Sequence, residues 1–248
     1  MSIKKNLKPG SNETLDSIRD IQLFQAKKGY RFSVDAVLLE NFIALKQREK
    51  GIELGTGSGV ISILLAKRLK RARITAVEIQ KSMADRAKRN VKLNGMDERV
   101  EVLTEDIKLL KEMYPTNTFD FALSNPPFRK PETGRMSLDN ERAVARHELD
   151  ISLPDLIDSA SYLLKHSGRF YLIYHPFRLV ELIELLRTKR LEPKRMRFVH
   201  SRLGEEAKMV LIEAMKGSGT WLRVDPPLYI HEKGNKYTEE MNSILGRG

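Results

Sequence analysis

Glu53-Leu54-Gly55-Thr56-Gly57-Ser58-Gly59 joins a short apolar stretch to a predicted helix, and this junction decides the fold. The residues that lead into it, 51–54, predict a buried strand, and residues 60–69 predict a helix. Alternate glycines permit a tight turn and a close approach of the backbone to a ligand. The free amide groups at a helix N-terminus attract polar groups. The stretch therefore predicts a strand–loop–helix unit with a ligand site in its loop.

The same alternation of strand and helix continues on both sides of this unit. Further strands are predicted over residues 73–78, 100–103, 119–124 and 169–174, and further helices over 34–45, 81–93, 153–165 and 177–189. This order favours an α/β fold with a doubly wound parallel sheet. Two late strand candidates, 195–200 and 208–215, follow each other without a helix and predict an antiparallel hairpin.

The chain divides by composition into a short N-terminal part and a long remainder. Residues 1–32 are expected to form an N-terminal arm and a short hairpin, and residues 33–248 a single domain that includes the C-terminal tail. Trp221 is expected to pack under this tail, which continues into a polar turn and a short helix. The length of 248 residues suffices for one large α/β domain with a full core.

Composition limits the classes of protein to which the chain can belong. There are no cysteines, which excludes disulfides and cysteine-based zinc sites and permits a cytoplasmic location, the one we expect. No run reaches the roughly 18 consecutive apolar residues of a membrane span, and no secretory signal is apparent at the start. Lys and Arg number 44 against 33 acids, a net charge of +11 that favours a polyanionic partner such as nucleic acid. Many soluble proteins are simply basic, so charge alone leaves the partner open.

A second informative stretch, Asn125-Pro126-Pro127-Phe128, follows the apolar strand candidate 119–124. Two prolines cannot continue a hydrogen-bonded ladder, because neither has an N–H group to donate. The Asn125 side-chain oxygen and the Pro126 carbonyl could both accept from one NH2 group, while the Phe128 ring stacks on the planar group that carries it. The alternative is an ordinary strand end followed by a proline turn.

The two stretches together resemble motifs of the class I S-adenosylmethionine-dependent methyltransferases. The loop has the spacing Gly-x-Gly-x-Gly with an acid two residues earlier, whereas the dinucleotide fingerprint is Gly-x-Gly-x-x-Gly. A carboxylate there suits a cationic ligand, and S-adenosyl-L-methionine carries an ammonium and a sulfonium group. The resemblance implies a Rossmann-like, seven-stranded methyltransferase sheet whose last strand is antiparallel, with S-adenosyl-L-methionine as the cofactor.

The resemblance also assigns cofactor-binding roles to residues at the strand ends. Glu78 would accept from the ribose hydroxyls, unless it is a solvated acid. Asp106 would accept from the adenine amino group, with Glu105 as a competitor and a helix N-cap as the alternative. Phe32 and Asp35 would cover the methionine end, or serve packing and capping. The expected cofactor-binding residues are Phe32, Asp35, Glu53, Gly55, Thr56, Gly57, Gly59, Glu78, Asp106 and Asn125.

The expected catalytic residues are Asn125, Pro126, Pro127 and Phe128. They act by positioning an amino nitrogen for attack on the sulfonium methyl group. No metal is required, and the five histidines form no zinc-type spacing. The long irregular segment 129–150 carries the cations expected to contact RNA phosphates: Arg129, Lys130, Arg135, Arg142, Arg146 and His147. A catalytic base is the alternative role for His147.

The Asn-Pro-Pro motif alone does not choose the substrate. Related enzymes modify adenine N6 in DNA or RNA, guanine N2 in ribosomal RNA, or glutamine in release factors. Over nearly its whole length the chain resembles the methyltransferases that modify N6 of the adenine next to the anticodon of a valine tRNA. The matching pieces are residues 15–18, 29–39, 53–59, 124–128, 142–148 and 226–238.

The resemblance implies a tRNA substrate, no membrane partner and, as we expect, a monomer. A target adenine in a loop would be unstacked at low cost. An rRNA guanine-N2 or protein glutamine methyltransferase is the alternative, and Phe128 keeps the guanine reading open because the guanine-N2 group also has Phe at this position. A non-catalytic RNA-binding module is the third reading.

Overall fold

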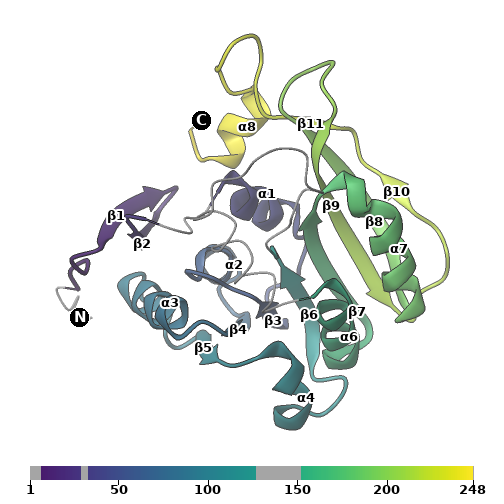
Figure 1. Ribbon diagram of the computed structural model, residues 1–248, viewed down its shortest axis with the longest axis horizontal. Coiled ribbons are helices and arrows are strands. Elements are labelled where there is room, and N and C mark those ends of the chain that lie inside the picture. The colour runs from purple at the N-terminus through teal and green to yellow at the C-terminus, as the bar shows by residue number, and fades with distance from the viewer. Residues whose placement is uncertain (1–6, 29–32, 127–151, 248) are drawn as a thin grey trace, which may run out of the picture.

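The computed structural model describes residues 7–28, 33–126 and 152–247 (Figure 1). The strands in chain order are β1 (Glu13–Ile18), β2 (Ile21–Ala26), β3 (Lys50–Leu54), β4 (Arg73–Glu78), β5 (Val100–Thr104), β6 (Phe119–Ser124), β7 (Leu164–Tyr174), β8 (Leu191–His200), β9 (Ala207–Lys216), β10 (Arg223–Val224) and β11 (Leu228–Tyr229). The helices are α1 (Val34–Phe42), α2 (Val60–Arg68), α3 (Lys81–Leu93), α4 (Leu110–Met113), α6 (Leu153–Leu163), α7 (Leu179–Thr188) and α8 (Glu239–Ile244), with 3-10 turns η1 (Ile107–Leu109) and η2 (Pro176–Arg178).

The central sheet has the order β10-β8-β9-β7-β6-β3-β4-β5, and β11 also pairs with β8. Neighbouring strands from β5 to β7 pair in parallel. Strand β9 pairs antiparallel with both β7 and β8. The predicted α/β fold with seven strands and an antiparallel last strand is therefore confirmed. The two short strands β10 and β11, which the sequence did not predict, add to one edge of the sheet.

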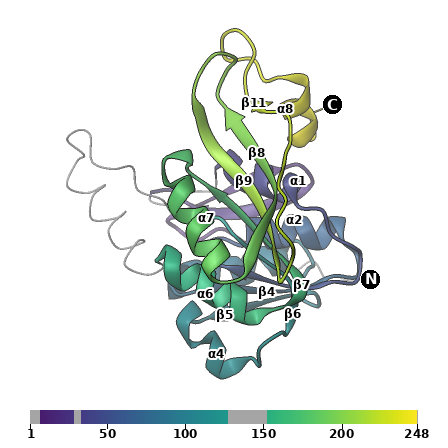
Figure 2. The ribbon, with the colours of Figure 1, turned by 90° about the vertical axis from the view of Figure 1, so that its right-hand side faces the viewer.

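Strand periodicity divides the core into two layers, one on each face of the sheet. In β7, Tyr171 and Ile173 pack with the buried residues of α1 and α2, and Phe170 and Leu172 pack with those of α6 and α7. Figure 2 shows these two groups of helices on either side of the sheet. Because parallel strands share their carboxyl ends, the loops after β3, β4 and β6 meet at one edge, which is where ligands bind in open α/β sheets.

The N-terminal hairpin β1–β2 packs against α3 instead of extending freely (Figure 1). Ile21 and Leu23 are buried in the main core cluster. Glu13 forms ion pairs with Arg86 at 3.0 Å and Arg89 at 2.7 Å. The hairpin is thus attached by apolar burial and by charge to the same helix that flanks the glycine loop.

The C-terminal tail runs along β8 and returns to α1. The predicted short helix is present as α8, whose Thr238 side chain accepts from the Met241 amide as an N-cap. Met241 and Ile244 are buried in the same cluster as the hairpin residues. Arg19 donates to the Ile244 carbonyl at 2.7 Å, so the turn of the N-terminal hairpin meets the C-terminal helix α8 there.

Several predicted boundaries were wrong; the strand predicted over 195–200, for example, begins at Leu191, and the helix predicted over 153–165 ends at Leu163. Two further cases have identifiable reasons. The helix predicted over 34–45 ends at Phe42, because Arg68 takes up the carbonyls of Glu40 and Ile43 at 3.0 and 2.9 Å. The strand predicted over 169–174 begins earlier, since Leu164 already pairs with β6 across a register shift. In the described part of the chain, no helix combines the length and the apolar character needed to cross a membrane.

Candidate active site

The glycine loop leaves β3 at Gly55 and enters α2 at Gly59. Gly55, Gly57 and Gly59 have φ of 77°, 60° and 84°, which favours glycine at each position. The amides of Gly55 and Thr56 both donate to the Val77 carbonyl of β4, at 3.0 and 2.9 Å. The loop is therefore fastened to the neighbouring strand, and its backbone lies at the carboxyl edge of the sheet.

Glu53 lies beneath this loop and is only 1% exposed. Its Oε2 accepts from the Thr56 hydroxyl at 2.7 Å, from the Ser62 amide at 3.1 Å and from the Ser62 hydroxyl. Burial raises the pKa of this carboxyl from 4.5 to about 7, although the hydrogen bonds from Ser62 and Thr56 oppose the shift. The carboxyl thus braces the loop, and a nearby cation would favour its charged form.

Glu78 ends β4 and is buried beside the loop. Its carboxylate accepts from the Gly57 amide and from the Gln80 amide, both at 2.9 Å. Asp106 follows β5 and caps η1 by accepting from the Lys108 amide at 2.9 Å, while Glu105 accepts from the Asp106 amide. The capping alternative for Asp106 is thus seen directly, and the adenine contact of either acid stays a prediction.

Asn125 follows β6 and lies within reach of the glycine loop. Ser124, which is fully buried, donates to the Leu54 carbonyl at 2.6 Å and ties the end of β6 to the end of β3. Asn125 then lines a small cavity of about 10 Å³ together with Ala36 of α1 and residues of the loop, Glu53, Gly55, Thr56 and Ser58 among them. The structure therefore brings the amide of the second motif and the loop of the first motif to one place.

Two features of this edge went unnoticed in the sequence. Ser58 is buried in the loop, and its hydroxyl has no hydrogen-bond partner among the described residues. At the end of β7, the rings of His175 and Phe177 stack at a centroid distance of 5.2 Å and an interplanar angle of 27°, with Phe177 45% exposed. Phe177, an aromatic residue that comes shortly after a predicted strand end, is the sequence signal from which this pair could have been predicted.

Several predicted residues lie outside the described part of the chain: Phe32, Pro127, Phe128, Arg129, Lys130, Arg135, Arg142, Arg146 and His147. Asp35, in the first turn of α1, and Pro126, which is buried, are described. Within the described residues, no group of three or more His, Asp or Glu side chains could hold a metal ion. The site that can be assembled therefore consists of the loop, Glu78, Asn125 and Pro126.

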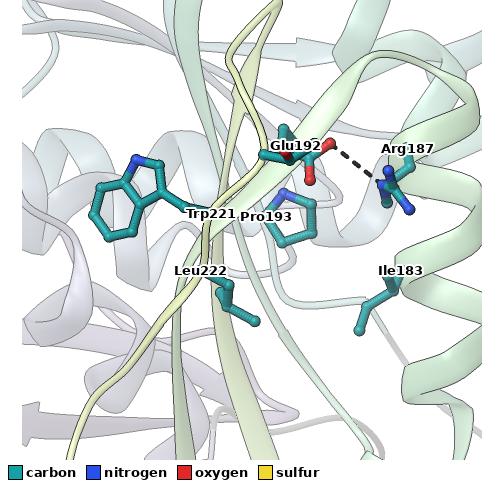
Figure 3. A pocket seen from close by; sticks show the side chains of 7 residues that line it. Ile183, Arg187, Glu192, Pro193, Trp221 and Leu222 are labelled. Carbon is teal, nitrogen blue, oxygen red and sulfur yellow. Dashed lines mark hydrogen bonds and ion pairs between the residues drawn. The ribbon is translucent and has the colours of Figure 1, made fainter.

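A second and larger hollow, about 310 Å³, lies between α7 and the segment that leads into β10 (Figure 3). Ile183 and Arg187 come from α7, and Leu222 from the segment before β10, while Arg187 pairs with Glu192 at 3.4 Å. Because Glu192 begins β8, this hollow lies toward the opposite end of the sheet from the glycine loop. The expectation that Trp221 packs under the tail was wrong. Its side chain is 64% exposed, and Lys194 lies over the ring at 4.5 Å.

The fold and the site together define a class of protein. Class I S-adenosylmethionine-dependent methyltransferases combine a parallel sheet that has one antiparallel strand with a glycine loop after β3, an acid at the end of β4 and Asn-Pro after β6. The sequence model of the family described as "Methyltransferase small domain" matches residues 33–188, more than half of the chain. The chain belongs to this family. The resemblance drawn from the two motifs is thereby confirmed.

Curated relatives carry one recurring name. A protein of Porphyromonas gingivalis named tRNA1(Val) (adenine(37)-N6)-methyltransferase is 34% identical over 164 residues, which are 65% of this chain and 64% of that protein. A protein of Shewanella halifaxensis with the same name is 29% identical over 85% of this chain and 88% of its own length. The chain thus aligns with slightly less than two thirds of the first relative and with most of the second.

Solved structures agree on the fold. A crystal structure described as a predicted O-methyltransferase from Agrobacterium tumefaciens superposes with a TM-score of 0.70 at 26% identity, covering 86% of this chain and 97% of that one. A SAM-dependent O-methyltransferase from Thermotoga maritima gives a TM-score of 0.54 at 18% identity, covering 78% and 69%. The second likeness concerns the fold alone.

Proposed function

We propose that this chain uses S-adenosyl-L-methionine to methylate the exocyclic N6 of an adenine in tRNA, the adenine next to the anticodon of a valine tRNA. The observation that carries the proposal is the cavity shared by Asn125 and the glycine loop. In this cavity the Asn125 side-chain amide, which can accept from an NH2 group, lies beside the glycine loop, which we expect to hold the methyl donor. The names of the curated relatives and the net charge of +11 support a tRNA as the substrate.

The cofactor lies over the glycine loop in this proposal. Gly55, Thr56, Gly57 and Gly59 offer a close backbone approach, and the Glu53 carboxyl beneath them favours the positive charge of the cofactor's ammonium and sulfonium groups. Glu78 accepts from the ribose hydroxyls in addition to the Gly57 amide that it already binds. Asp106 or Glu105 accepts from the cofactor's adenine, and Phe32 and Asp35 cover its methionine end.

The methyl transfer is a direct displacement. The adenine N6 lone pair forms a bond to the methyl carbon, the carbon–sulfur bond breaks, and sulfur keeps the electron pair as S-adenosylhomocysteine leaves. The nitrogen then loses a proton to water. Asn125 Oδ1 and the Pro126 carbonyl accept the two N6–H groups, so that the lone pair points at the methyl group and the developing positive charge is stabilised by acceptors already in place. Phe128 stacks on the base, and Pro127 stiffens the backbone between them.

The substrate approaches from the carboxyl edge of the sheet. Ser124 of β6 pairs with Leu172 of β7, so the ring pair His175–Phe177 follows β7 at the edge where Asn125 follows β6. An exposed ring there offers a stacking face to a base beside the target, a contact worth roughly 1–3 kcal/mol per base. The cations of the segment after Phe128, Arg129, Lys130, Arg135, Arg142, Arg146 and His147, contact the phosphates. The enzyme acts in the cytoplasm as a monomer and needs no metal.

The test uses tritium-labelled S-adenosylmethionine with total RNA and total protein, followed by mass spectrometry of the nucleosides and of the hydrolysed protein. The proposal predicts N6-methyladenosine in the tRNA fraction. Label in N2-methylguanosine of ribosomal RNA, or in glutamine of a protein, would contradict the substrate while leaving the reaction class intact. No incorporation into either fraction would contradict the activity itself.

A further inference from the structure

Two asparagines of α3 bind the N-terminal hairpin through its backbone. The Asn94 side chain donates to the Gln22 carbonyl at 2.7 Å and accepts from the Gln22 amide at 3.1 Å. The Asn90 side chain does the same with Phe24, donating at 3.1 Å and accepting at 2.6 Å. Each side-chain amide thus occupies the place of a residue in a neighbouring strand and covers the outer edge of β2.

The spacing explains why a helix can imitate a strand here. Residues four apart in a helix are separated by about 6 Å along the axis, and residues two apart in a strand by about 6.6 Å. Asn90 and Asn94 therefore lie level with Phe24 and Gln22. An exposed strand edge is covered in this way without a further strand.

Among the residues that the structure describes, Asn90 also binds a third segment and Asn94 does not. The second Nδ2 hydrogen of Asn90 goes to the Ser58 carbonyl in the glycine loop, at 2.9 Å. Asn94 instead donates to the Asn90 carbonyl of its own helix, at 2.8 Å. Asn90 is fully buried. Its side-chain oxygen and both Nδ2 hydrogens form hydrogen bonds, and these join three segments: α3, β2 and the glycine loop.

The part of the loop that Asn90 holds is the part that lines the cavity beside Asn125. Ser58 lies between Gly57 and Gly59, both with positive φ, and the other side of its peptide plane is held by the Gly59 amide, which donates to the Thr56 carbonyl at 3.0 Å. The buried Ser58 hydroxyl has no partner among the described residues, and the residue lines the cavity that Asn125 also lines. Gly59 packs on Ala87 of α3: a Cβ added to Gly59 would lie 3.4 Å from the Ala87 Cβ. Helix α3 therefore contacts the loop at two consecutive residues, Ser58 and Gly59, and fixes their position.

We infer that Asn90 is a positioning residue for the cofactor loop and that it couples the docking of the N-terminal hairpin to cofactor affinity. The inference rests on the proposed function in one respect, since it takes the glycine loop to hold S-adenosylmethionine. Its consequence is reciprocal: an ordered hairpin strengthens cofactor binding, and a bound cofactor holds the hairpin more tightly.

The experiment compares Asn90→Ala with Asn94→Ala in the full chain. Both variants lose two hydrogen bonds to β2, and only Asn90→Ala loses the bond to the loop. We expect Asn90→Ala to raise the Kd of S-adenosylhomocysteine, measured by calorimetry, and the KM for S-adenosylmethionine about tenfold. Its kcat at saturating cofactor should change less than about twofold. Asn94→Ala should leave all three constants within about twofold, because Asn90 and the ion pairs of Glu13 still hold the hairpin on α3. Equal effects of the two variants, or no effect of either, would overturn the inference.

A measurement on the unaltered protein decides the case if Asn90→Ala does not fold. Hydrogen exchange of the β2 amides is followed with and without S-adenosylhomocysteine. Slower exchange at Phe24 in the complex, by about fivefold or more, is expected. Unchanged exchange while the compound demonstrably binds would overturn the coupling alone. Absence of any binding to the unaltered protein would overturn the cofactor assignment, and the coupling with it.

Discussion

The two hollows at opposite ends of the sheet differ in chemistry as well as in size. The hollow between α7 and β10 measures about 310 Å³ and is lined mainly by apolar side chains, together with Thr220 and one partly exposed ion pair (Figure 3). The cavity between the glycine loop and Asn125 measures only about 10 Å³. Yet Glu53 and Thr56 in the lining of the small cavity, and Glu78 and Ser124 beside it, are buried and hydrogen-bonded.

This contrast shows that buried, hydrogen-bonded polar groups identify the site better than the volume of a hollow does. Burying a polar group is unfavourable unless a partner satisfies it, and the fold accepts several such groups at the carboxyl edge of β3, β4 and β6. The hollow at the other end requires none of this. Substitutions at the small cavity should therefore affect methyl transfer more than substitutions at the large hollow do.

The largest effect is expected for Asn125→Ala. Loss of the acceptor that orients the substrate amine should lower kcat by about a hundred- to a thousandfold, because the interaction is made mainly in the transition state. The Kd of S-adenosylhomocysteine should stay within about threefold. Asn117→Ala is the matched control, since Asn117 is an exposed asparagine just before the opposite end of β6. Near-normal turnover of Asn125→Ala would refute its assigned role.

The pH dependence of stability should expose the strained setting of Glu53. Its pKa is raised from 4.5 to about 7 in the folded protein, so the folded state holds the proton more tightly than the unfolded chain does. The contribution to stability is full below pH 4.5 and is lost as the pH rises through about 7, by about 3 kcal/mol in total. Urea unfolding at several pH values should show this decline, and Glu53→Gln should lack it. Parallel curves for the two proteins would contradict the shift.

A smaller effect is expected for Glu78→Gln. The change removes the charge that accepts from the Gly57 amide and, in the proposal, from the ribose hydroxyls. The Kd of S-adenosylhomocysteine should rise about tenfold, as for the loss of one hydrogen bond to a charged group. Glu101→Gln in the neighbouring strand β5, an exposed acid, serves as the control and should leave the Kd unchanged. An unchanged Kd in Glu78→Gln would remove this acid from the cofactor site.

The smallest effect is expected at the large hollow. Leu222→Ser and Trp221→Ala alter its lining without touching the carboxyl edge. Both variants should keep kcat and the KM for S-adenosylmethionine within about twofold, as surface changes remote from a site usually do. A tenfold loss of turnover in either folded variant would break the contrast on which the comparison rests.

Much of the fold followed from local sequence pattern. The alternation of apolar runs and helical periods predicted the strands from β3 to β9, because each buried element carries its own period. The short strands β10 and β11 escaped prediction. Each has only two residues, and they exist because the tail pairs with the edge of β8, which no local pattern reports.

The site was predictable where a motif placed several residue types side by side. The glycine loop and Asn125 come together as expected, because parallel strands share one carboxyl edge. Asn90 could not be assigned, since an asparagine within a helix gives no sign of the strand that its side chain will meet. The buried role of Ser58 and the ring pair at His175 likewise depend on contacts between distant segments.

A crystal structure with bound S-adenosylhomocysteine tests the central claim most directly. The account predicts that the compound lies along the glycine loop, with its sulfur directed toward Asn125 and its ribose against Glu78. Binding in the hollow between α7 and β10, or an Asn125 amide turned away from the sulfur and into the core, would contradict it.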